Sequence, residues 1–517
     1  MQIIGTIAAG HSDTANAAKH VLREGGNAFD AVIAAMFAAC VAEPVLASLG
    51  GGGFLLAQPT GQHARLYDFF AHTPKRKLPE SDIDFYPITA DFGDAQQEFH
   101  IGMGSIATPG MVKGAFHIHT QLCSLPIKQL VAPAIELARN GGVVNPFQHY
   151  IASIVEPILC SSDSAFALHC APDANDEFAP VGTLLRQPQM ADAFEALALE
   201  GESLFYQGEM AHKLVEDSRQ NGGLMTLRDL RDYRVFVRKP LTLDYHHARI
   251  TTNPPPSLGG LLIAFSLSLL APHTLGDHPF SSATHLRHIA RAMRITQRLR
   301  RGGYLERMSE PWEILAPSWI RSHLKELTTP TRFTRGTTQI SIADHRGNLA
   351  SMTLSNGEGS GYVLPGTGIM LNNMLGEEDL NPNGFHRWQA DSRIASMMAP
   401  TFVVSREGYR VATGSGGSNR IRSAILQVIS NLVDFDMELT KAVAAPRIHY
   451  ESGILHLEPE RSQETLRQLA DEFPKQKLWQ NRNLYFGGAH TVKCAADGGM
   501  EGSGDPRRGG VSVVVRL

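Results

Sequence analysis

Residues 336–355 have the sequence Gly-Thr-Thr-Gln-Ile-Ser-Ile-Ala-Asp-His-Arg-Gly-Asn-Leu-Ala-Ser-Met-Thr-Leu-Ser. Residue types alternate over residues 337–343 and again over 349–355, and a period of two is typical of β-strands. The intervening residues 344–348 include Asp, Gly and Asn, which favour a turn. The stretch therefore predicts a β-hairpin that begins at Thr337.

Helices and further strands are predicted on both sides of this hairpin. Residues 12–42 should form two helices, the first capped by Ser12 or Asp13 and the second by Asn27. Helical periodicity dominates from residue 109 to about residue 300. Further strands are expected over residues 401–405, 409–413 and 511–515. Strands near both ends of the chain predict one interwoven α/β body.

The composition is that of a globular protein. Of the 517 residues, 43% are hydrophobic and 19% are charged, which excludes disordered, collagen-like and coiled-coil classes. The formal net charge is -4, so the chain lacks the basic excess typical of nucleic-acid-binding proteins. Six arginines between Arg287 and Arg301 indicate a solvated helix face, with a nucleic-acid-binding helix as the alternative.

Disulfides, metals and cofactors are not expected. The five cysteines are odd in number and widely spaced, with no C-x-x-C pair, and a reducing compartment is allowed. His246 and His247 are adjacent, so on a strand they would point to opposite faces and could not bind one metal together. Gly50 to Gly53 precede a strand, whereas a phosphate-binding loop follows one, so these glycines indicate close backbone packing.

No membrane span or signal peptide is predicted. The most apolar stretch, residues 31–42, is shorter than the ~20 residues that a membrane helix needs and fits a buried helix instead. The first residues lack a charged region ahead of an apolar run. We expect a cytoplasmic protein with no membrane partner, or a secreted one if a signal has been removed.

Thr337 is the candidate nucleophile. A threonine hydroxyl needs a base to attack an amide, and an N-terminal threonine uses its own α-amino group. Thr337 gains such an amine only if the chain is cut after Gly336. Thr353 and Ser355 share one face of the return strand and are expected to present hydroxyls toward Thr337. Taken alone, Gly-Thr-Thr is a weak signal, because β-branched residues also favour strands.

A series of sequence blocks, in one order along essentially the whole chain, resembles the γ-glutamyltranspeptidase family. The blocks are residues 25–31, 43–44, 50–54, 107–110, 132–138, 254–260, 365–368, 371–373, 445–450 and 504–507. The resemblance implies an N-terminal-nucleophile hydrolase with a four-layer αββα sandwich. It also implies a precursor that cuts itself into a large subunit, residues 1–336, and a small subunit, residues 337–517, both interwoven in one body.

The resemblance also assigns roles in the reaction. Thr337 matches the family's nucleophile and Ser355 its second hydroxyl residue. Gly416 and Gly417 match the pair whose backbone N–H groups form the oxyanion hole. Glycine suits this role, because it lets backbone donors approach the developing oxyanion closely. A strand-to-helix turn is the structural alternative for this pair.

The residues expected to hold the substrate depart from the family pattern. Phe70 stands where the family binds the glutamyl α-carboxylate with an Arg, and Met374 where it carries an amide or acid. Ser396 keeps the first of two family serines, and Met397 replaces the second. The acid that meets the substrate amino group is retained as Glu377.

Further departures lie close to the nucleophile. Gln339 replaces the usual His two residues after it, and the family's Asn near the second hydroxyl falls at Gly357 or at Asn356. The segment between residues 379 and 396 is shorter than in members with a lid loop. Lys75 or Arg76 is the candidate replacement for the missing Arg.

These observations predict intact reaction machinery with an altered substrate clamp. We expect an enzyme that cleaves γ-glutamyl amides, such as glutathione-type amides, through an acyl-enzyme on Thr337. Water or an amine or peptide would accept the acyl group, with substrate contacts from Thr353, Asn356, Glu377 and Ser396. The alternatives are a glutaryl or cephalosporin-type acylase with weak γ-glutamyl specificity, and an uncleaved, non-catalytic scaffold.

Overall fold

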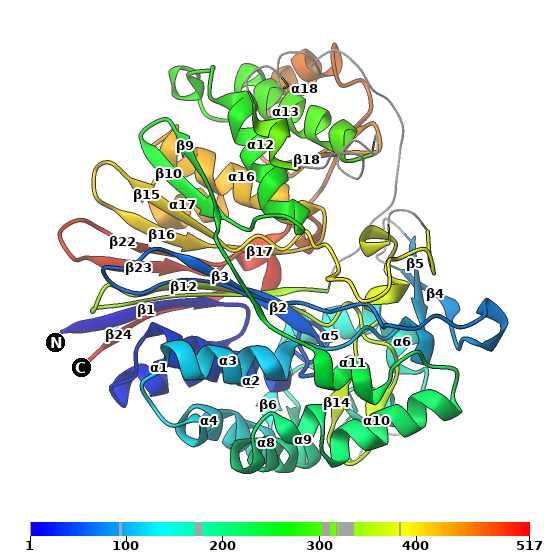
Figure 1. Cartoon of the computed structure of the whole chain (residues 1–517). Coiled ribbons are helices and arrows are strands. Elements are labelled where there is room, and N and C mark those ends of the chain that lie inside the picture. Colours follow the sequence, from blue (N-terminus) through cyan, green and yellow to red (C-terminus); the bar gives the residue numbers. More distant parts are fainter. Residues whose placement is uncertain are drawn as a thin grey trace.

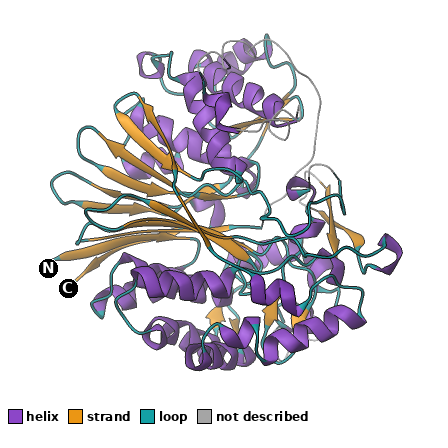
Figure 2. Ribbon diagram, viewed as in Figure 1, coloured by secondary structure: helices purple, strands orange, loops and turns teal. Residues whose placement is uncertain are grey.

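Two antiparallel sheets lie face to face between two layers of helices in the computed structural model (Figure 1 and Figure 2). The structure describes residues 2–91, 96–170, 178–301, 311–316, 319, 336–381 and 384–517. The layer order helix, sheet, sheet, helix confirms the predicted four-layer αββα sandwich.

The first sheet has seven strands. Their order is β24 (Val511–Arg516), β1 (Ile3–Ala9), β11 (Thr338–Asp344), β12 (Leu349–Ser355), β2 (Gly52–Gln58), β3 (Arg65–Phe69) and β8 (Phe236–Arg238). β11 and β12 are the predicted hairpin, with Gln339 opposite Thr353. Because β1 pairs with β11 and β2 with β12, strands from before residue 336 enclose the hairpin on both sides.

The second sheet has six strands. Their order is β23 (Met500–Ser503), β22 (Thr491–Cys494), β16 (Arg410–Thr413), β15 (Thr401–Ser405), β10 (Ala248–Thr252) and β9 (Leu241–Tyr245). Hydrogen bonds join the two sheets directly. The Ser351 hydroxyl donates to the Thr413 carbonyl at 2.7 Å, and the Ser341 hydroxyl donates to the His490 carbonyl at 2.8 Å.

Both faces of the hairpin are therefore buried. Ile340 and Ile342 on β11, and Met352 and Leu354 on β12, belong to a hydrophobic cluster under the first helix layer. The alternating polar residues face the second sheet, and every residue of both strands is buried. The period of two was predicted correctly, and the polar face meets the second sheet of the predicted αββα sandwich.

The first helix layer covers the outer face of the seven-stranded sheet (Figure 1). Its helices are α1 (Ser12–Arg23), α2 (Ala28–Ala42), α3 (Met111–Leu122), α4 (Ile127–Asn140), α8 (Pro188–Glu200), α9 (Ser203–Tyr206), α10 (Glu209–Gln220) and α11 (Leu227–Asp232). At one end lie α5 (Pro146–Ile154), α6 (Glu156–Leu159), α7 (Asp163–Ala167), the ribbon of β6 (Gly142–Val143) and β7 (Leu184–Leu185), and the hairpin of β4 (Tyr86–Asp91) and β5 (Gln96–Ile101).

The second helix layer covers the six-stranded sheet and comprises α12 (Leu258–Leu270), α13 (Ala283–Arg301), α16 (Arg420–Val433) and α17 (Leu439–Ala444) (Figure 1). Beyond it lie α18 (Gln463–Ala470) and a three-stranded sheet of β18 (Ile448–Glu451), β19 (Ile454–Leu457) and β20 (Gln476–Leu478). Arg287, Arg291 and Arg294 of α13 all form ion pairs with Glu472. No helix among the described residues is long and apolar enough to cross a membrane.

Helix α2 is the central element of the first helix layer, and all of its residues are buried. Asn27 and Asp30 form a capping box at its N-terminus, which confirms the predicted cap. Asp344, at the end of β11, accepts a further hydrogen bond from the Ala28 N–H at 2.8 Å. These contacts fix α2 against the hairpin.

The cap of α1 was predicted wrongly. The N-cap is His11, whose extended backbone places Nδ1 3.1 Å from the Asp13 N–H. An imidazole acceptor thus replaces the hydroxyl or carboxylate expected from Ser12 or Asp13.

Gly50 to Gly53 lie where backbones cross closely. A Cβ on any of the four would lie within 3 Å of a backbone atom of Met370, Ser355, Phe69 or Thr353. The four glycines therefore serve close packing, as predicted.

Replacing Asn27 by Ala should lower the free energy of unfolding by about 1–2 kcal/mol. The Asn27 carboxamide oxygen accepts from the N–H groups of Phe29 and Asp30, and its Nδ2 donates to the Leu122 carbonyl. Urea unfolding followed by circular dichroism measures the change. Asn140→Ala, at the exposed end of α4, is the matched control and should have little effect. Equal effects of the two substitutions would contradict the role of the cap.

Candidate active site

Thr337 lies immediately before β11 and is 6% exposed. Its carbonyl accepts a hydrogen bond from Nη1 of Arg508 at 3.1 Å. Gly416 lies so close that a Cβ there would overlap the same carbonyl oxygen. The candidate nucleophile is thus enclosed by residues far apart in the sequence.

The Ser355 hydroxyl contacts the peptide bond that precedes Thr337. It donates a hydrogen bond to the carbonyl oxygen of Gly336 and accepts one from the Gly357 N–H at 3.1 Å. A Cβ at position 336 would overlap the Gly357 carbonyl, so only glycine fits there. The geometry therefore orients one hydroxyl donor toward the bond that the sequence predicts to be cut.

The buried carboxylate of Glu43 contacts the first residue of β11. Glu43, the residue after α2, accepts hydrogen bonds from the Thr338 hydroxyl at 2.6 Å and from the Thr14 hydroxyl at 2.8 Å. Burial raises the pKa of Glu43, while nearby His11 and these hydrogen bonds oppose the rise. Sequence analysis gave Glu43 no role, although a glutamate directly after the apolar stretch of residues 31–42 was a usable signal.

Gly416 and Gly417 form a strand-to-helix turn that lies against Thr337. Ser415 and Gly416 form β17, which pairs with β21 (Gly488–Ala489), and α16 begins at Arg420. Gly417 has a φ of 118°, which favours glycine. The turn brings this backbone to Thr337, the candidate nucleophile, which is the position that the predicted oxyanion hole would require.

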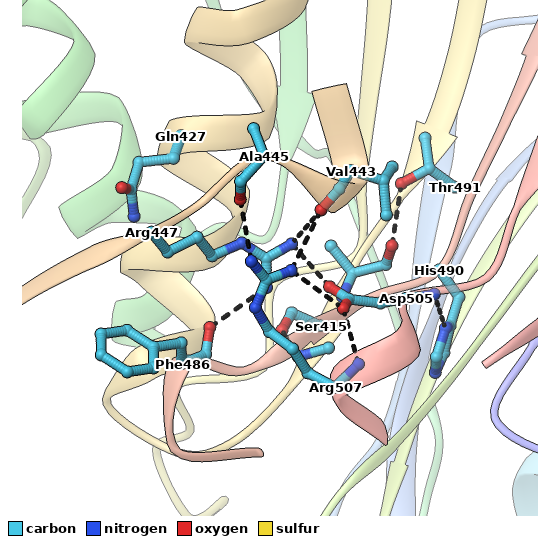
Figure 3. A network of polar contacts seen from close by, with 12 residues as sticks. Ser415, Gln427, Val443, Ala445, Arg447, Phe486, His490, Thr491, Asp505 and Arg507 are labelled. Carbon is cyan, nitrogen blue, oxygen red and sulfur yellow. Dashed lines mark hydrogen bonds and ion pairs between the residues drawn. The ribbon is translucent and has the colours of Figure 1, made fainter. Parts of the chain in front are cut away.

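Four buried charged side chains hold this turn in place: Arg447, Asp505 and Arg507, which Figure 3 shows, and Glu458. Arg447 donates to Asp505 at 2.6 Å, and Arg507 contacts both Asp505, at 3.1 Å, and Glu458, at 2.5 Å. Although burial alone would raise it, the two guanidinium groups hold the pKa of Asp505 below its ordinary value. Every charge in this network is therefore matched.

The network reaches the active site through its backbone contacts. Asp505 accepts a hydrogen bond from the Ala489 N–H at 2.8 Å, and Ala489 is the strand partner of Ser415. The residue after Arg507 is Arg508, which donates to the Thr337 carbonyl. Sequence analysis recognised the block that ends at Arg507 but missed Arg508.

Thr353 and Gln339 contact each other between the sheets. The Thr353 hydroxyl donates to Oε1 of Gln339 at 2.6 Å, and Nε2 of Gln339 donates to the hydroxyls of Ser341 and Ser351. Ser355 therefore contacts the Gly336 carbonyl, whereas Thr353 contacts the residue that replaces the family's His. A substrate contact by Thr353 stays a prediction.

Glu377 lies beside the turn that follows β12. A Cβ on Gly357 would overlap Oε1 of Glu377 and Oδ1 of Asn373. Glu377 is 8% exposed, and no described residue forms a hydrogen bond with its Oε1. Burial, with the nearby carboxylates of Glu358 and Asp379, holds the pKa of Glu377 well above its ordinary value. A cation placed beside this group would favour its ionised form.

Asn356 and Ser396, the two remaining predicted substrate contacts, are both buried. Nδ2 of Asn356 contacts the Met370 carbonyl at 3.4 Å, and its Oδ1 has no partner among the described residues. The Ser396 hydroxyl accepts from the Met398 N–H at 3.1 Å, and its carbonyl accepts from the Ser257 hydroxyl at 2.8 Å. Ser396 thus anchors the turn before α12 in this structure.

The residues at the three altered positions are all buried in one large hydrophobic cluster. Phe70, Met374 and Met397 are 1%, 1% and 5% exposed and belong to the same buried group. The Phe70 ring stacks on Phe54 with a centroid distance of 5.5 Å. Phe70 therefore contributes an apolar ring at the position where the family resemblance implies an arginine.

Neither candidate replacement cation is directed to that cluster by its contacts. Lys75 pairs with Asp391 at 2.6 Å, and Arg76 donates to the carbonyls of Leu224 and Gly223. Within the described part of the chain, no group of three His, Cys, Asp or Glu side chains is placed to hold a metal ion.

Comparisons with known proteins agree over the whole chain. The family described as gamma-glutamyltranspeptidase matches residues 14–515. The glutathione hydrolase proenzyme of Escherichia coli (strain K12) is 28% identical over 524 residues, covering 94% of this chain and 87% of that protein. The acylase ACY 1 proenzyme of Pseudomonas sp. (strain SE83) is 29% identical over 488 residues, covering 88% and 84%.

A solved structure shows the same fold. The cephalosporin acylase from Bacillus halodurans superposes with a TM-score of 0.83 at 23% identity, covering 99% of this chain and 96% of that one. From the match over residues 14–515 we conclude that the chain belongs to the γ-glutamyltranspeptidase family and is an enzyme of the acyltransferase and amide-hydrolase class.

Proposed function

We propose that the chain is an amide-bond hydrolase or acyltransferase whose nucleophile, Thr337, becomes N-terminal by self-cleavage after Gly336. The observation that carries this proposal is the hydrogen bond from the Ser355 hydroxyl to the Gly336 carbonyl oxygen. A donor on that oxygen stabilises the negative charge that develops when the carbonyl carbon is attacked.

The cleavage is an acyl shift followed by hydrolysis. The Thr337 hydroxyl attacks the Gly336 carbonyl carbon, the C–N bond breaks, and the nitrogen takes up the proton to become the α-amine of Thr337. Water then hydrolyses the resulting ester, which leaves a carboxylate on Gly336 and a free hydroxyl on Thr337. The new α-amine supplies the base that the internal residue lacked.

The same groups would perform the reaction on substrate. Thr337 attacks the substrate amide carbon, and the backbone N–H groups of Gly416 and Gly417 stabilise the oxyanion. The leaving amine takes a proton from the α-ammonium of Thr337. Water or a second amine then removes the acyl group from the hydroxyl and completes the cycle.

The acyl group that fits best is a γ-glutamyl group recognised mainly by its ammonium. Glu377 is a buried carboxylate whose Oε1 has no described partner, and a substrate ammonium would supply one. Phe70, Met374 and Met397 offer no cation for an α-carboxylate. This apolar cluster favours, as the second candidate, an acylase with weak γ-glutamyl specificity that accepts acyl groups without an α-carboxylate.

Purified chain should separate into pieces of 336 and 181 of the 517 residues, and Ser355→Ala should slow that separation by about 10²–10³-fold. The substitution removes the donor to the Gly336 carbonyl. Denaturing gels of freshly translated protein, sampled over time, give the rate, and N-terminal sequencing of the small piece should begin at Thr337.

Thr337→Ala is the matched blank for this experiment and should remain a single 56.3 kDa chain. An active wild-type enzyme that stays intact would overturn both the cleavage and the nucleophile. Cleavage of Ser355→Ala at the wild-type rate would remove Ser355 from the mechanism.

Three anilides test how the acyl group is recognised: γ-glutamyl, 4-aminobutyryl, which lacks the α-carboxylate, and glutaryl, which lacks the ammonium. Glu377→Gln should lower kcat/KM by about 10–100-fold for the two substrates with an ammonium and leave the glutaryl anilide nearly unchanged. The wild type should use the γ-glutamyl and 4-aminobutyryl anilides to within about tenfold of each other, because the contacts of Lys75 and Arg76 direct neither cation to Phe70.

Glu378→Gln, at the exposed neighbour of Glu377, is the control and should leave all three rates alone. A γ-glutamyl preference over 4-aminobutyryl of about a thousandfold would mean that some cation does bind the α-carboxylate. An equal loss for all three substrates in Glu377→Gln would point to a structural role for Glu377.

The ratio of kcat/KM for the γ-glutamyl anilide over the glutaryl anilide should fall as the pH is lowered. The raised pKa of Glu377 means that its carboxylate is protonated at a pH above the ordinary carboxyl range, and only the ionised form pairs with the ammonium. Rates are compared below the pKa of the substrate ammonium. The ratio should be independent of pH in Glu377→Gln, and a wild-type ratio without this pH dependence would contradict the pairing.

A further inference from the structure

A cavity lies at one end of the first helix layer, apart from the cluster of Phe70, Met374 and Met397. It lies between the end of α2, the β6–β7 ribbon and α5, and its volume is about 40 Å³. Four polar side chains line it: His149, whose Nδ1 contacts the Ala179 carbonyl at 3.2 Å, and three further ones, His11, Gln148 and His169. We call this space the His11 cavity.

His11, Gln148 and His169 are buried in the wall of the His11 cavity, and each has polar atoms without a hydrogen-bond partner among the described residues. His11, Gln148 and His169 are 2%, 8% and 6% exposed. Among the described residues, Nε2 of both histidines and both amide atoms of Gln148 have no hydrogen-bond partner. Leaving a buried polar group unpaired destabilises the fold, so several such groups that line one cavity indicate a ligand.

The hydrogen-bonding roles of two of these groups are determined. Nδ1 of His11 accepts from the Asp13 N–H, so a neutral His11 carries its proton on Nε2 and presents a donor. The Gln148 amide offers one acceptor oxygen and one donor nitrogen. A matching ligand therefore needs an acceptor for His11 and a donor for the Gln148 oxygen.

The ligand should be uncharged. None of the described residues that line the cavity is Asp, Glu, Lys or Arg. Burial lowers the pKa of His169 to about 4, so this ring is neutral at ordinary pH. An ionic ligand would lose its hydration without gaining an opposite charge.

The entrance of the cavity is apolar. Val143 lines it and pairs across the ribbon with Leu184, and each of these side chains is 50% exposed. The wall includes Val45 and Phe178. Water molecules can form hydrogen bonds with the polar atoms of an empty site, but only a ligand with an alkyl group would also bury this apolar surface.

We propose that the His11 cavity binds a small primary carboxamide. Its carbonyl oxygen accepts from Nε2 of His11, its NH₂ group donates to Oε1 of Gln148, and its alkyl chain lies against the apolar wall toward Val143. His11 follows Gly10, and a Cβ on Gly10 would contact both Glu43 and the Thr338 hydroxyl. A ligand bound to His11 would therefore lie close to Glu43, which accepts a hydrogen bond from Thr338 at the start of β11.

The test uses full-length Thr337→Ala chain and propionamide as the probe. This chain lacks the proposed nucleophile, so the binding result does not depend on whether the proposed function is correct. Saturation-transfer NMR should show saturable binding of propionamide and binding of propionate, which is matched in shape but charged, that is at least about tenfold weaker. A crystal soaked with propionamide should place it between His11 and Gln148.

Two further substitutions in this chain locate the site. Gln148→Leu should raise the Kd for propionamide at least about tenfold, and Gln129→Leu, at an exposed position on α4, should leave it within about twofold. The unfolding temperature of Gln148→Leu should not fall, because the substitution removes an unpaired buried amide. If Gln148→Leu fails to fold, Ala152→Leu fills the cavity from its wall and should also weaken binding.

Four results would overturn the proposal. They are no saturable binding of propionamide, unchanged affinity in Gln148→Leu or Ala152→Leu, equal binding of propionate, and ordered water alone in the cavity of the soaked crystal.

Discussion

The buried charges of Asp505 and Glu458 must be matched by Arg447 and Arg507, and the geometry of the active site depends on this requirement. An unpaired ion at such a depth would cost more than the surrounding packing returns, so the segments that carry the four side chains cannot move independently. Asp505 also accepts a hydrogen bond from Ala489 in β21, the partner strand of β17, and Arg507 is the residue before Arg508. The position of the Gly416 backbone against Thr337 therefore follows from an electrostatic constraint on the far side of the turn.

Glycine makes the remaining contacts around Thr337 possible. A side chain at 336, 357 or 416 would overlap a carbonyl or carboxyl oxygen of the site. These positions explain why the nucleophile is enclosed by backbone from several segments while Ser355 still reaches the Gly336 carbonyl. Close approach of backbones is a packing requirement, and here it also brings hydrogen-bond donors to the place where charge would develop.

The hairpin could be predicted from the sequence because alternation, turn residues and strand formers agree within residues 337–355. Its second buried face could not, because alternation with polar residues is also typical of a strand that faces water. Glu43 and Arg508 were missed for a similar reason: they contact Thr338 and Thr337 across 295 and 171 residues. The cap of α1 was predicted wrongly because residue preferences rank Ser and Asp above His, while the extended backbone at His11 determines which acceptor reaches the Asp13 N–H.

The three positions at which the chain departs from the family's substrate-binding pattern are best considered together. Phe70, Met374 and Met397 belong to the same buried cluster, and Phe70 also stacks on Phe54. A single arginine at position 70 would place a guanidinium among apolar side chains, and its desolvation would be costly without a partner. Because the interior is closely packed, we expect a change of charge at this position to require further changes around it. Glu377 is a separate buried carboxylate, and under the proposed function it remains available to pair with the substrate ammonium when the apolar cluster supplies no partner for the α-carboxylate.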